Sequence, residues 1–350
     1  MSEKKDLTEL PIRRQNILNS SYVVAQANEE IGLRGVSFQN ETYVTKKAVC
    51  DFYDVSERTL EDCIQTNGDE LSRNGYVTLR GSDLRRFAAE FEKTTGETLS
   101  KTIPKLGIFS FRAFLNVGML LKGSERAAEV RCKLLDIAIS EVDKRTSGSS
   151  LYVNRRERDF IPRAAKEIGY RKRFTDALRD YVDAGPFKYA VFTNKIYQSI
   201  FREKAREYRE LLSLPENIDI RHSLYSSVLL VVSVYENGLA NLFERESQRK
   251  GRKLSYREAD DCFSIFEQDC VLMPMIEDAR EKMASRDYAF RQVFHDKLAE
   301  YLREVSPEEY EALLGEQSVD LHEESRRIPK EMFEAGLDGA RESMLRLKAS

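Results

Sequence analysis

The sequence has few of the residues that usually mark metal centres, disulfide-stabilised domains and nucleotide-dependent enzymes. Its three His lie far apart, and none has a second His at ligand spacing. Its five Cys are scattered and form no CxxC pair, so neither a disulfide framework nor a zinc ribbon is indicated, and a reducing cytoplasm fits best. No GxxxxGK[ST] or GxGxxG loop occurs. We therefore expect no metal and no cofactor.

Proline and long hydrophobic runs are also scarce. The 8 Pro among 350 residues favour long helices over loops. The first residues, MSEKKDLTELPIRRQ, lack the apolar core of a signal peptide. The most apolar stretch, residues 224–243, is interrupted by polar side chains and predicts a buried core helix rather than a membrane span. A cytoplasmic protein with no membrane partner is the expectation.

The distribution of patterns predicts a mainly α fold, with an N-terminal winged helix-turn-helix followed by a large all-helical C-terminal domain. Residues 1–40 form an N-terminal arm, polar at first and then extended or strand-like from residue 21. The winged helix-turn-helix covers residues 41–92, and a helical bridging region covers residues 105–146. After Ser147-Gly148-Ser149-Ser150, which we interpret as the principal boundary, the C-terminal domain spans residues 151–305. An acidic helical tail, residues 306–350, completes the chain.

The clearest local signal is YVTKKAVCDFYDVSERTLEDCIQ, residues 43–65. Thr45 can cap a first helix, Asp54-Val55 makes a short turn, and Ser56 can cap a second helix. A short helix, a tight turn and a second capped helix form the architecture that places a recognition helix in the major groove of DNA.

The following residues predict a winged form of this module. Asn74-Gly75 is a tight-turn signal, and residues 76–80 have the pattern of a strand. Ser82 is a candidate cap for a helix over residues 83–91. Residues 105–145 hold two helical runs, the second of which starts at Ser124, a good N-cap.

The charge of this module leaves two interpretations open. Residues 41–90 carry 7 Lys+Arg against 10 Asp+Glu, and the second helix sets Glu57, Glu61 and Asp62 against the single Arg58. In one interpretation the module contacts DNA, where a carboxylate is useful only as an acceptor for a cytosine amine. In the other it binds protein or has lost its ligand. The DNA-binding candidates in this part of the chain are Thr45, Lys46, Lys47, Ser56, Arg58, Thr59, Arg73 and Arg80.

A basic region follows. Residues 101–210 hold 24 Lys+Arg against 14 Asp+Glu, and aromatic residues alternate with the cations around residues 152–174. Arginines there can neutralise phosphates, and aromatic rings can stack on unpaired bases. The alternative is a solvated helical face whose aromatics turn into the core. The candidates are Arg155, Arg156, Arg158, Arg171, Lys172 and Arg173.

One segment, residues 282–302, offers a hypothesis of catalysis. On a continuous helix, Arg291 and His295 would share a face, with Asp287 one turn before Arg291. Such a pair can serve acid–base cleavage of RNA, although the spacing differs from the Arg-x4-6-His pattern of helical ribonuclease toxins. The alternative is an amphipathic helix with surface ion pairs.

The segment ETYVTKKAVCDFYDVSERTLEDCI resembles the N-terminal module of the RhuM virulence-protein family, which is related to phage antirepressor and KilA-N/BRO-type DNA-binding proteins. GSERAAEVRCKLLDIAISEV resembles the helix that follows that module. FRAFLNVGMLLKGSERAAEVR, RKRFTDALRDYV and EDAREKMASRDYAFRQVFHDKLAEYL resemble RhuM-like bacterial proteins of mobile elements. The resemblance implies DNA binding in a phage-defence or toxin–antitoxin setting and supplies no catalytic residues.

The expected function is therefore duplex DNA binding by a homo-oligomer, with a partner protein from the same locus as a further expected partner. Two alternatives remain at this point: a helical ribonuclease-type toxin that uses Arg291 and His295, and a non-catalytic oligomeric scaffold.

Overall fold

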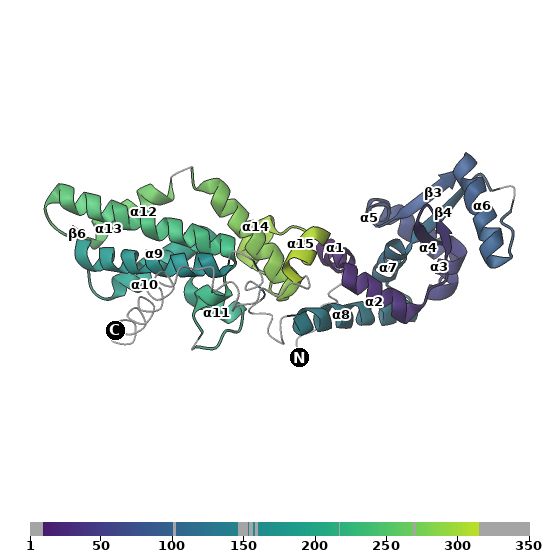
Figure 1. The fold of residues 1–350 in the computed structure, drawn as a ribbon, viewed down its shortest axis with the longest axis horizontal. Coiled ribbons are helices and arrows are strands. Elements are labelled where there is room, and N and C mark those ends of the chain that lie inside the picture. Colours follow the sequence, from purple (N-terminus) through teal and green to yellow (C-terminus); the bar gives the residue numbers. More distant parts are fainter. Residues whose placement is uncertain are drawn as a thin grey trace. The chain divides into compact units, whose positions relative to one another are not determined.

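Helices make up most of the chain in the computed structural model, which describes residues 10–100, 103–145, 153, 157, 160–216, 218–268 and 271–314 (Figure 1). The chain divides into two compact units, residues 1–145 with 306–310 and residues 146–305 with 311–350. The boundary predicted at residues 147–150 lies outside the described residues. Each unit has hydrophobic core clusters of its own.

Two helices open the first unit, α1 (Pro11–Asn19) and α2 (Ser21–Ile31). The flexible and extended arm predicted for residues 1–40 is therefore wrong over these helices. The physical reason is that α1 buries polar side chains. Gln15 donates hydrogen bonds to Asn19 and to Asn74, and Asn74 donates one back to Gln15. A helix face built from buried amides leaves no hydrophobic periodicity in the sequence.

A four-stranded antiparallel sheet follows, with the strand order β1-β2-β4-β3. Its strands are β1 (Val36–Phe38), β2 (Glu41–Thr45), β3 (Tyr76–Arg80) and β4 (Lys105–Ser110). The strand predicted at residues 76–80 is confirmed. The hairpin predicted at Asn74-Gly75 is wrong, because β3 pairs with β4, which follows a complete helix. The helical run predicted from residue 105 begins only at Phe111, where Ser110 caps it.

Six more helices complete the first unit up to residue 145. They are α3 (Lys46–Tyr53), α4 (Glu57–Thr66), α5 (Gly68–Arg73), α6 (Gly81–Thr95), α7 (Phe111–Leu120) and α8 (Glu125–Arg145). Helix α6 begins at Gly81 and ends at Thr95, so Ser82 lies inside it and is not its cap. Ser124 caps α8 as predicted. Helices α3, α4, α7 and α8 share one core cluster, while α6 and the sheet share another.

The second unit is a helical assembly around one large core cluster. Its helices are α9 (Phe160–Tyr181), α10 (Phe187–Phe201), α11 (Ala205–Leu211), α12 (Ser226–Lys250), α13 (Tyr256–Glu267) and α14 (Met273–Phe290), with the short 3-10 helices η2 (Ile220–Ser223) and η3 (Asp296–Tyr301). Two short parallel strands, β5 (Val182–Asp183) and β6 (Leu254–Ser255), correct the all-helical prediction. Helix α15 (Pro307–Leu314) lies in the predicted acidic tail, and residues 315–350 are outside the described part.

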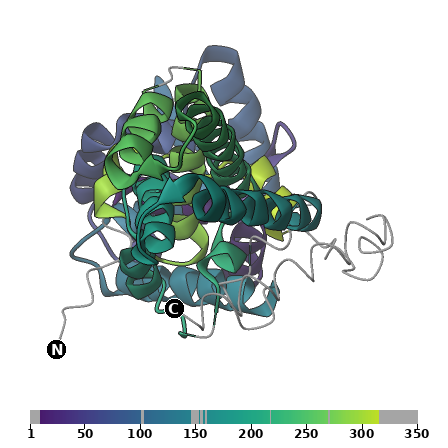
Figure 2. The same ribbon diagram turned by 90° about the vertical axis from the view of Figure 1, so that its left-hand side faces the viewer.

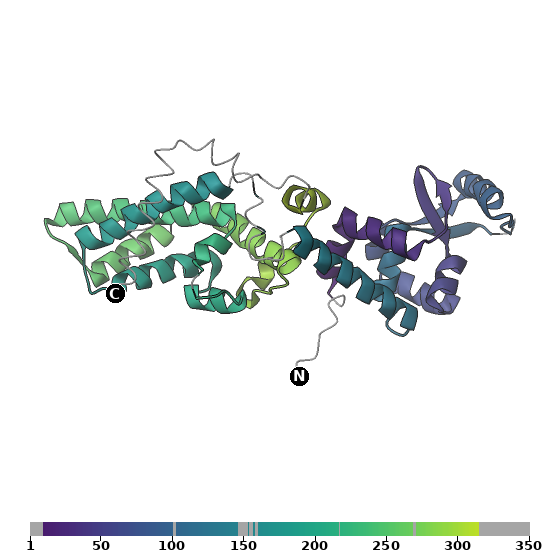
Figure 3. The same cartoon turned by 60° about the horizontal axis from the view of Figure 1, so that its bottom comes forward.

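Helix α12 is the central element of this second unit. It packs along α9 and also contacts α10, α13 and α14 (Figures 2 and 3). Among the described residues it alone is long and apolar enough to cross a membrane by length and composition. However, Val228, Val232, Leu239 and Phe243 are buried in the core, as the sequence predicts for residues 224–243. Glu236, on the same helix, is buried in an ion pair with Arg221.

Candidate functional site

The α3–turn–α4 segment of the first unit has the local geometry that its capping residues predict. Thr45 accepts a hydrogen bond from the Ala48 amide and starts α3, and Ser56 accepts one from the Thr59 amide and starts α4. Between them Asp54 has φ 51°, and the Val55 amide returns to the Cys50 carbonyl. The two helices are thus joined by a turn of fixed shape.

Helix α4 presents most of its surface to solvent. Leu60 is its one fully buried side chain, and Cys63 and Ile64 are half-buried. Arg58 and Thr59 are exposed near its N-terminus. A cleft of about 690 Å³ runs along one flank of α4 and is lined by Thr59, Asp62 and Lys122, among others. The helix is therefore accessible to a large ligand.

Lys46, the first residue of α3, bridges to α4. Its Nζ lies 2.9 Å from Oε1 of Glu61. This hydrogen bond and the charge of Lys46 lower the pKa of Glu61, and Lys105 contributes in the same direction. Glu61 is therefore an ionised carboxylate, and the negative charge of α4 is partly neutralised at this point.

The end of the sheet where residues 105–107 of β4 pair with β3 but not with β2, which we call the β3–β4 ribbon, lies beside this ion pair. Arg80 and Lys105 are register partners at its end, and both are exposed. Nearer to α3, Gly107 approaches both the Tyr76 hydroxyl and the aliphatic part of Lys46 so closely that a Cβ at Gly107 would lie 2.6 Å and 3.1 Å from them. Lys46 of α3 thus lies between Glu61 of α4 and Gly107 of β4, and the charge of Lys105 also acts on Glu61. Lys105 was not among the sequence candidates, because β4 was assigned to a helix.

The other candidates of this module lie apart from that group. Lys47 is exposed and lines a separate cleft of about 390 Å³ between β2, α3 and the end of α6. Arg73 is exposed in the last turn of α5. Thr45 and Ser56 serve as helix caps, so their hydroxyls are already engaged by backbone amides.

The basic segment of the second unit is largely engaged in contacts within the chain. Arg171 forms an ion pair with Asp219 at 2.8 Å, and Arg173 donates to Asn237 and Asn241 on α12. Lys172 is exposed. Phe160 and Phe174 are buried in the core, as the alternative interpretation of this segment predicts, whereas Tyr170 is 38% exposed. Arg155, Arg156 and Arg158 lie outside the described residues.

The predicted catalytic pair does not lie on one helix. Helix α14 ends at Phe290, Arg291 is its C-cap, and Gln292 has φ 57°, so the chain turns before His295. The helix predicted over residues 282–302 is therefore confirmed up to Phe290 and wrong beyond it. Both side chains are also buried, Arg291 being 7% and His295 1% exposed, so the surface ion-pair ladder of the alternative interpretation is wrong as well.

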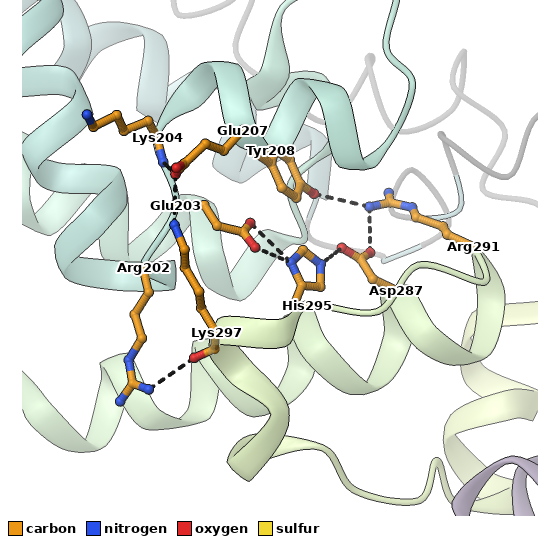
Figure 4. A network of polar contacts seen from close by, with 9 residues as sticks. All are labelled: Arg202, Glu203, Lys204, Glu207, Tyr208, Asp287, Arg291, His295 and Lys297. Carbon is orange, nitrogen blue, oxygen red and sulfur yellow. Dashed lines mark hydrogen bonds and ion pairs between the residues drawn. The ribbon is translucent and has the colours of Figure 1, made fainter. Parts of the chain in front are cut away.

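His295 instead lies between two carboxylates in a buried network (Figure 4). Its Nδ1 is 2.9 Å from Oε1 of Glu203, and its Nε2 is 2.8 Å from Oδ2 of Asp287. The other oxygen of Asp287 accepts hydrogen bonds from Arg291 and from the Tyr225 hydroxyl, each at 2.8 Å. The i, i+4 pairing of Asp287 with Arg291 expected from the sequence is confirmed.

Charge balance explains why this network can exist in the interior. Burial alone would lower the pKa of His295, but the hydrogen bonds and charges of Asp287 and Glu203 outweigh it and raise the pKa to about 9. Since carboxylates only accept hydrogen bonds, both ring nitrogens donate and the imidazole is a cation at neutral pH. Two cations thus face two anions. An imidazole with both nitrogens engaged cannot accept a proton from a substrate.

Glu203 is the network member that sequence reasoning missed. It lies 92 residues before His295, directly after α10, and no local pattern links the two. A second buried group was missed for the same reason: Arg221 is held between Glu167 and Glu236. Among the residues that the structure describes, no three His, Cys, Asp or Glu side chains are arranged to hold a metal ion.

Comparison with protein-family models, curated proteins and solved structures yields no match for this chain.

Proposed function

We propose that the first unit is a variant winged helix-turn-helix that binds duplex DNA, with α4 as recognition helix and the β3–β4 ribbon as wing. The observation that carries the proposal is the position of two cations at α4, a capped helix with one fully buried side chain: Lys46 pairs with Glu61 of this helix, and the charge of Lys105 lowers the pKa of the same carboxylate. Arg80 is the register partner of Lys105. A helix that enters the major groove needs an exposed outer face and cations beside it to meet the phosphates.

The acidic character of α4 constrains how it binds. Glu57, Glu61 and Asp62 repel phosphates, so the helix supplies base contacts while the ribbon supplies phosphate contacts. Arg58 is exposed and pairs with no described residue, which leaves its guanidinium available for the O6 and N7 acceptors of guanine. The resemblance of residues 41–64 to RhuM-type modules points to the same function.

Catalysis by Arg291 and His295 has no comparable support, because both side chains are buried and satisfied by carboxylates. In the second unit, Arg171 pairs with Asp219 and Arg173 donates a hydrogen bond to Asn237. We therefore assign DNA contact to the first unit, in the context of a mobile element or a defence locus.

The test is the salt dependence of duplex binding by the full chain. Each phosphate contact contributes about 0.9 to the slope of log affinity against log salt. The double variant Arg80→Gln/Lys105→Gln should bind any duplex more weakly and lower that slope by about 2. The matched control, Lys93→Gln/Lys133→Gln, removes two exposed cations of the same unit and should leave the slope unchanged. Equal slopes for both double variants and the parent would contradict the proposal.

A further inference from the structure

The Lys46–Glu61 ion pair has an unusual position for a surface salt bridge. It joins the two helices of the helix-turn-helix, and its Nζ and Oε1 atoms lie 2.9 Å apart. The side chains are 30% and 65% exposed, so the pair is open to a ligand that approaches α4. Exposed ion pairs contribute little to stability, about 0–1 kcal/mol. A contribution to folding stability therefore does not by itself explain the presence of this ion pair.

Each partner has hydrogen-bonding capacity left over. Oε2 of Glu61 accepts no hydrogen bond from any described residue, and the Lys46 ammonium donates only one of its three N–H groups within the described chain. The pair thus presents an acceptor and a donor side by side. Because the pKa of Glu61 is lowered, its carboxylate is ionised and can only accept hydrogen bonds.

A C·G base pair offers the complementary arrangement in the major groove. The cytosine N4 amine donates, and the guanine O6 beside it accepts. These two atoms are joined by a Watson–Crick hydrogen bond and so lie about 2.9 Å apart. Nζ of Lys46 and Oε1 of Glu61 are likewise 2.9 Å apart, and the free Oε2 belongs to the same carboxylate. A T·A or A·T pair fits less well, because the N7 acceptor next to the adenine amine repels a carboxylate.

We infer that the Lys46–Glu61 ion pair reads one C·G base pair, Glu61 accepting from cytosine N4 and Lys46 donating to the O6 of its paired guanine. This inference rests on the proposed function. It makes Glu61 a specificity-determining residue, and it gives the acidic recognition helix a positive role in selecting its site.

The experiment is a charge swap. Sites are selected from a random duplex library with the full-length parent and with Lys46→Glu/Glu61→Lys, a variant that keeps the ion pair and the net charge. The swapped pair should prefer G·C in place of C·G at one position of the site. Binding of each protein to its own preferred base pair should exceed binding to the inverted pair by about 10- to 100-fold.

Two controls separate the possible failures. Lys93→Glu/Glu90→Lys reverses an exposed ion pair on α6 and should select the same site as the parent. The single variant Glu61→Gln should lose the preference for C·G while binding duplex DNA at least as tightly. If the parent selects a site and the swap leaves every position unchanged, the inference is wrong and the proposed function stands. If the parent binds no duplex, the proposed function itself fails.

Discussion

At the scale of single residues, His295 shows how a titratable side chain can be held in a charged state inside a protein. The structure places its ring between Glu203 and Asp287 and sets Arg291 against the same aspartate. Removing one partner of a buried ion pair commonly costs about 3–5 kcal/mol, since the other charge is left uncompensated. Replacement of His295 by Ala should therefore be far more destabilising than an average substitution.

The network also predicts a pH dependence. The pKa of His295 is raised from its usual 6.5 to about 9, so its contribution is fully present below about pH 6.5 and is lost as the pH rises through about 9. Denaturant unfolding between pH 7 and 10 should show a steeper loss of unfolding free energy in the parent than in His295→Gln. His222→Gln, at an exposed histidine, should behave like the parent. Parallel curves for all three proteins would show that the imidazole is not held as a cation.

Arg58 carries the residue-level prediction about DNA. It is exposed on the first turn of α4, so its removal should not affect folding. Arg58→Ala should weaken binding to a selected duplex by about 1–3 kcal/mol, the range of a good base contact. Arg126→Ala, which removes an exposed arginine from α8, serves as the matched control. Equal affinities of parent and Arg58→Ala for the selected site would exclude this helix from base contact.

Some of these residues can be predicted from the sequence and others cannot. Caps such as Thr45, Ser56 and Ser124 are local, since the hydroxyl and the amide that it caps lie within one turn, and all three are predicted correctly. Glu203 and Glu167 find their partners far along the chain. No spacing rule reaches that distance, so the buried networks become visible only in the folded chain.

At the scale of elements, the errors have physical causes that particular residues show. Helix α1 is hard to predict because most of its buried side chains are polar: Arg14, which pairs with Glu70, and three amides are buried together with Ile17 and Leu18. Strand β4 falls within a run that the sequence predicts as helical, because the apolar residues from Phe109 onward are also compatible with a helical period, although the helix starts only after Ser110. Short apolar runs satisfy both periods, and strand pairing decides between them.

A glycine comparison tests packing between elements of the second unit. Gly238 lies in α12, where an added Cβ would come within 2.2 Å of the Phe266 ring of α13. Gly169 lies in α9, and a Cβ there meets nothing within 4 Å. Alanine is the better helix former by about 1 kcal/mol. Gly169→Ala should therefore stabilise the protein by up to about that amount, whereas Gly238→Ala should destabilise it by about 1–3 kcal/mol through overpacking.

Thermal unfolding of the two glycine variants provides the measurement. The expected result is a higher midpoint for Gly169→Ala and a lower one for Gly238→Ala. Equal shifts in the same direction would mean that the α12–α13 contact is looser than described.

At the scale of the whole molecule, the two units place their charged side chains differently. The first unit combines an exposed α4 with a small sheet whose β3–β4 end carries Arg80 and Lys105. The second unit contains two buried groups of compensated charges, one at Arg221 and Glu236 and one at His295 and Asp287. The mainly helical class follows from the sequence because scarce proline and repeated amphipathic periods act over long segments. The pairing of β3 with β4 does not follow, because it depends on a contact across α6.

The central claim is that the first unit recognises duplex DNA by sequence. Selection of sites by the full-length protein from a random duplex library, followed by affinity measurement on the enriched and on an unrelated duplex, tests it most directly. The account predicts one enriched site, bound at least about 10³-fold more tightly than the unrelated duplex at physiological salt. No enrichment, with equal affinity for both duplexes, would contradict it.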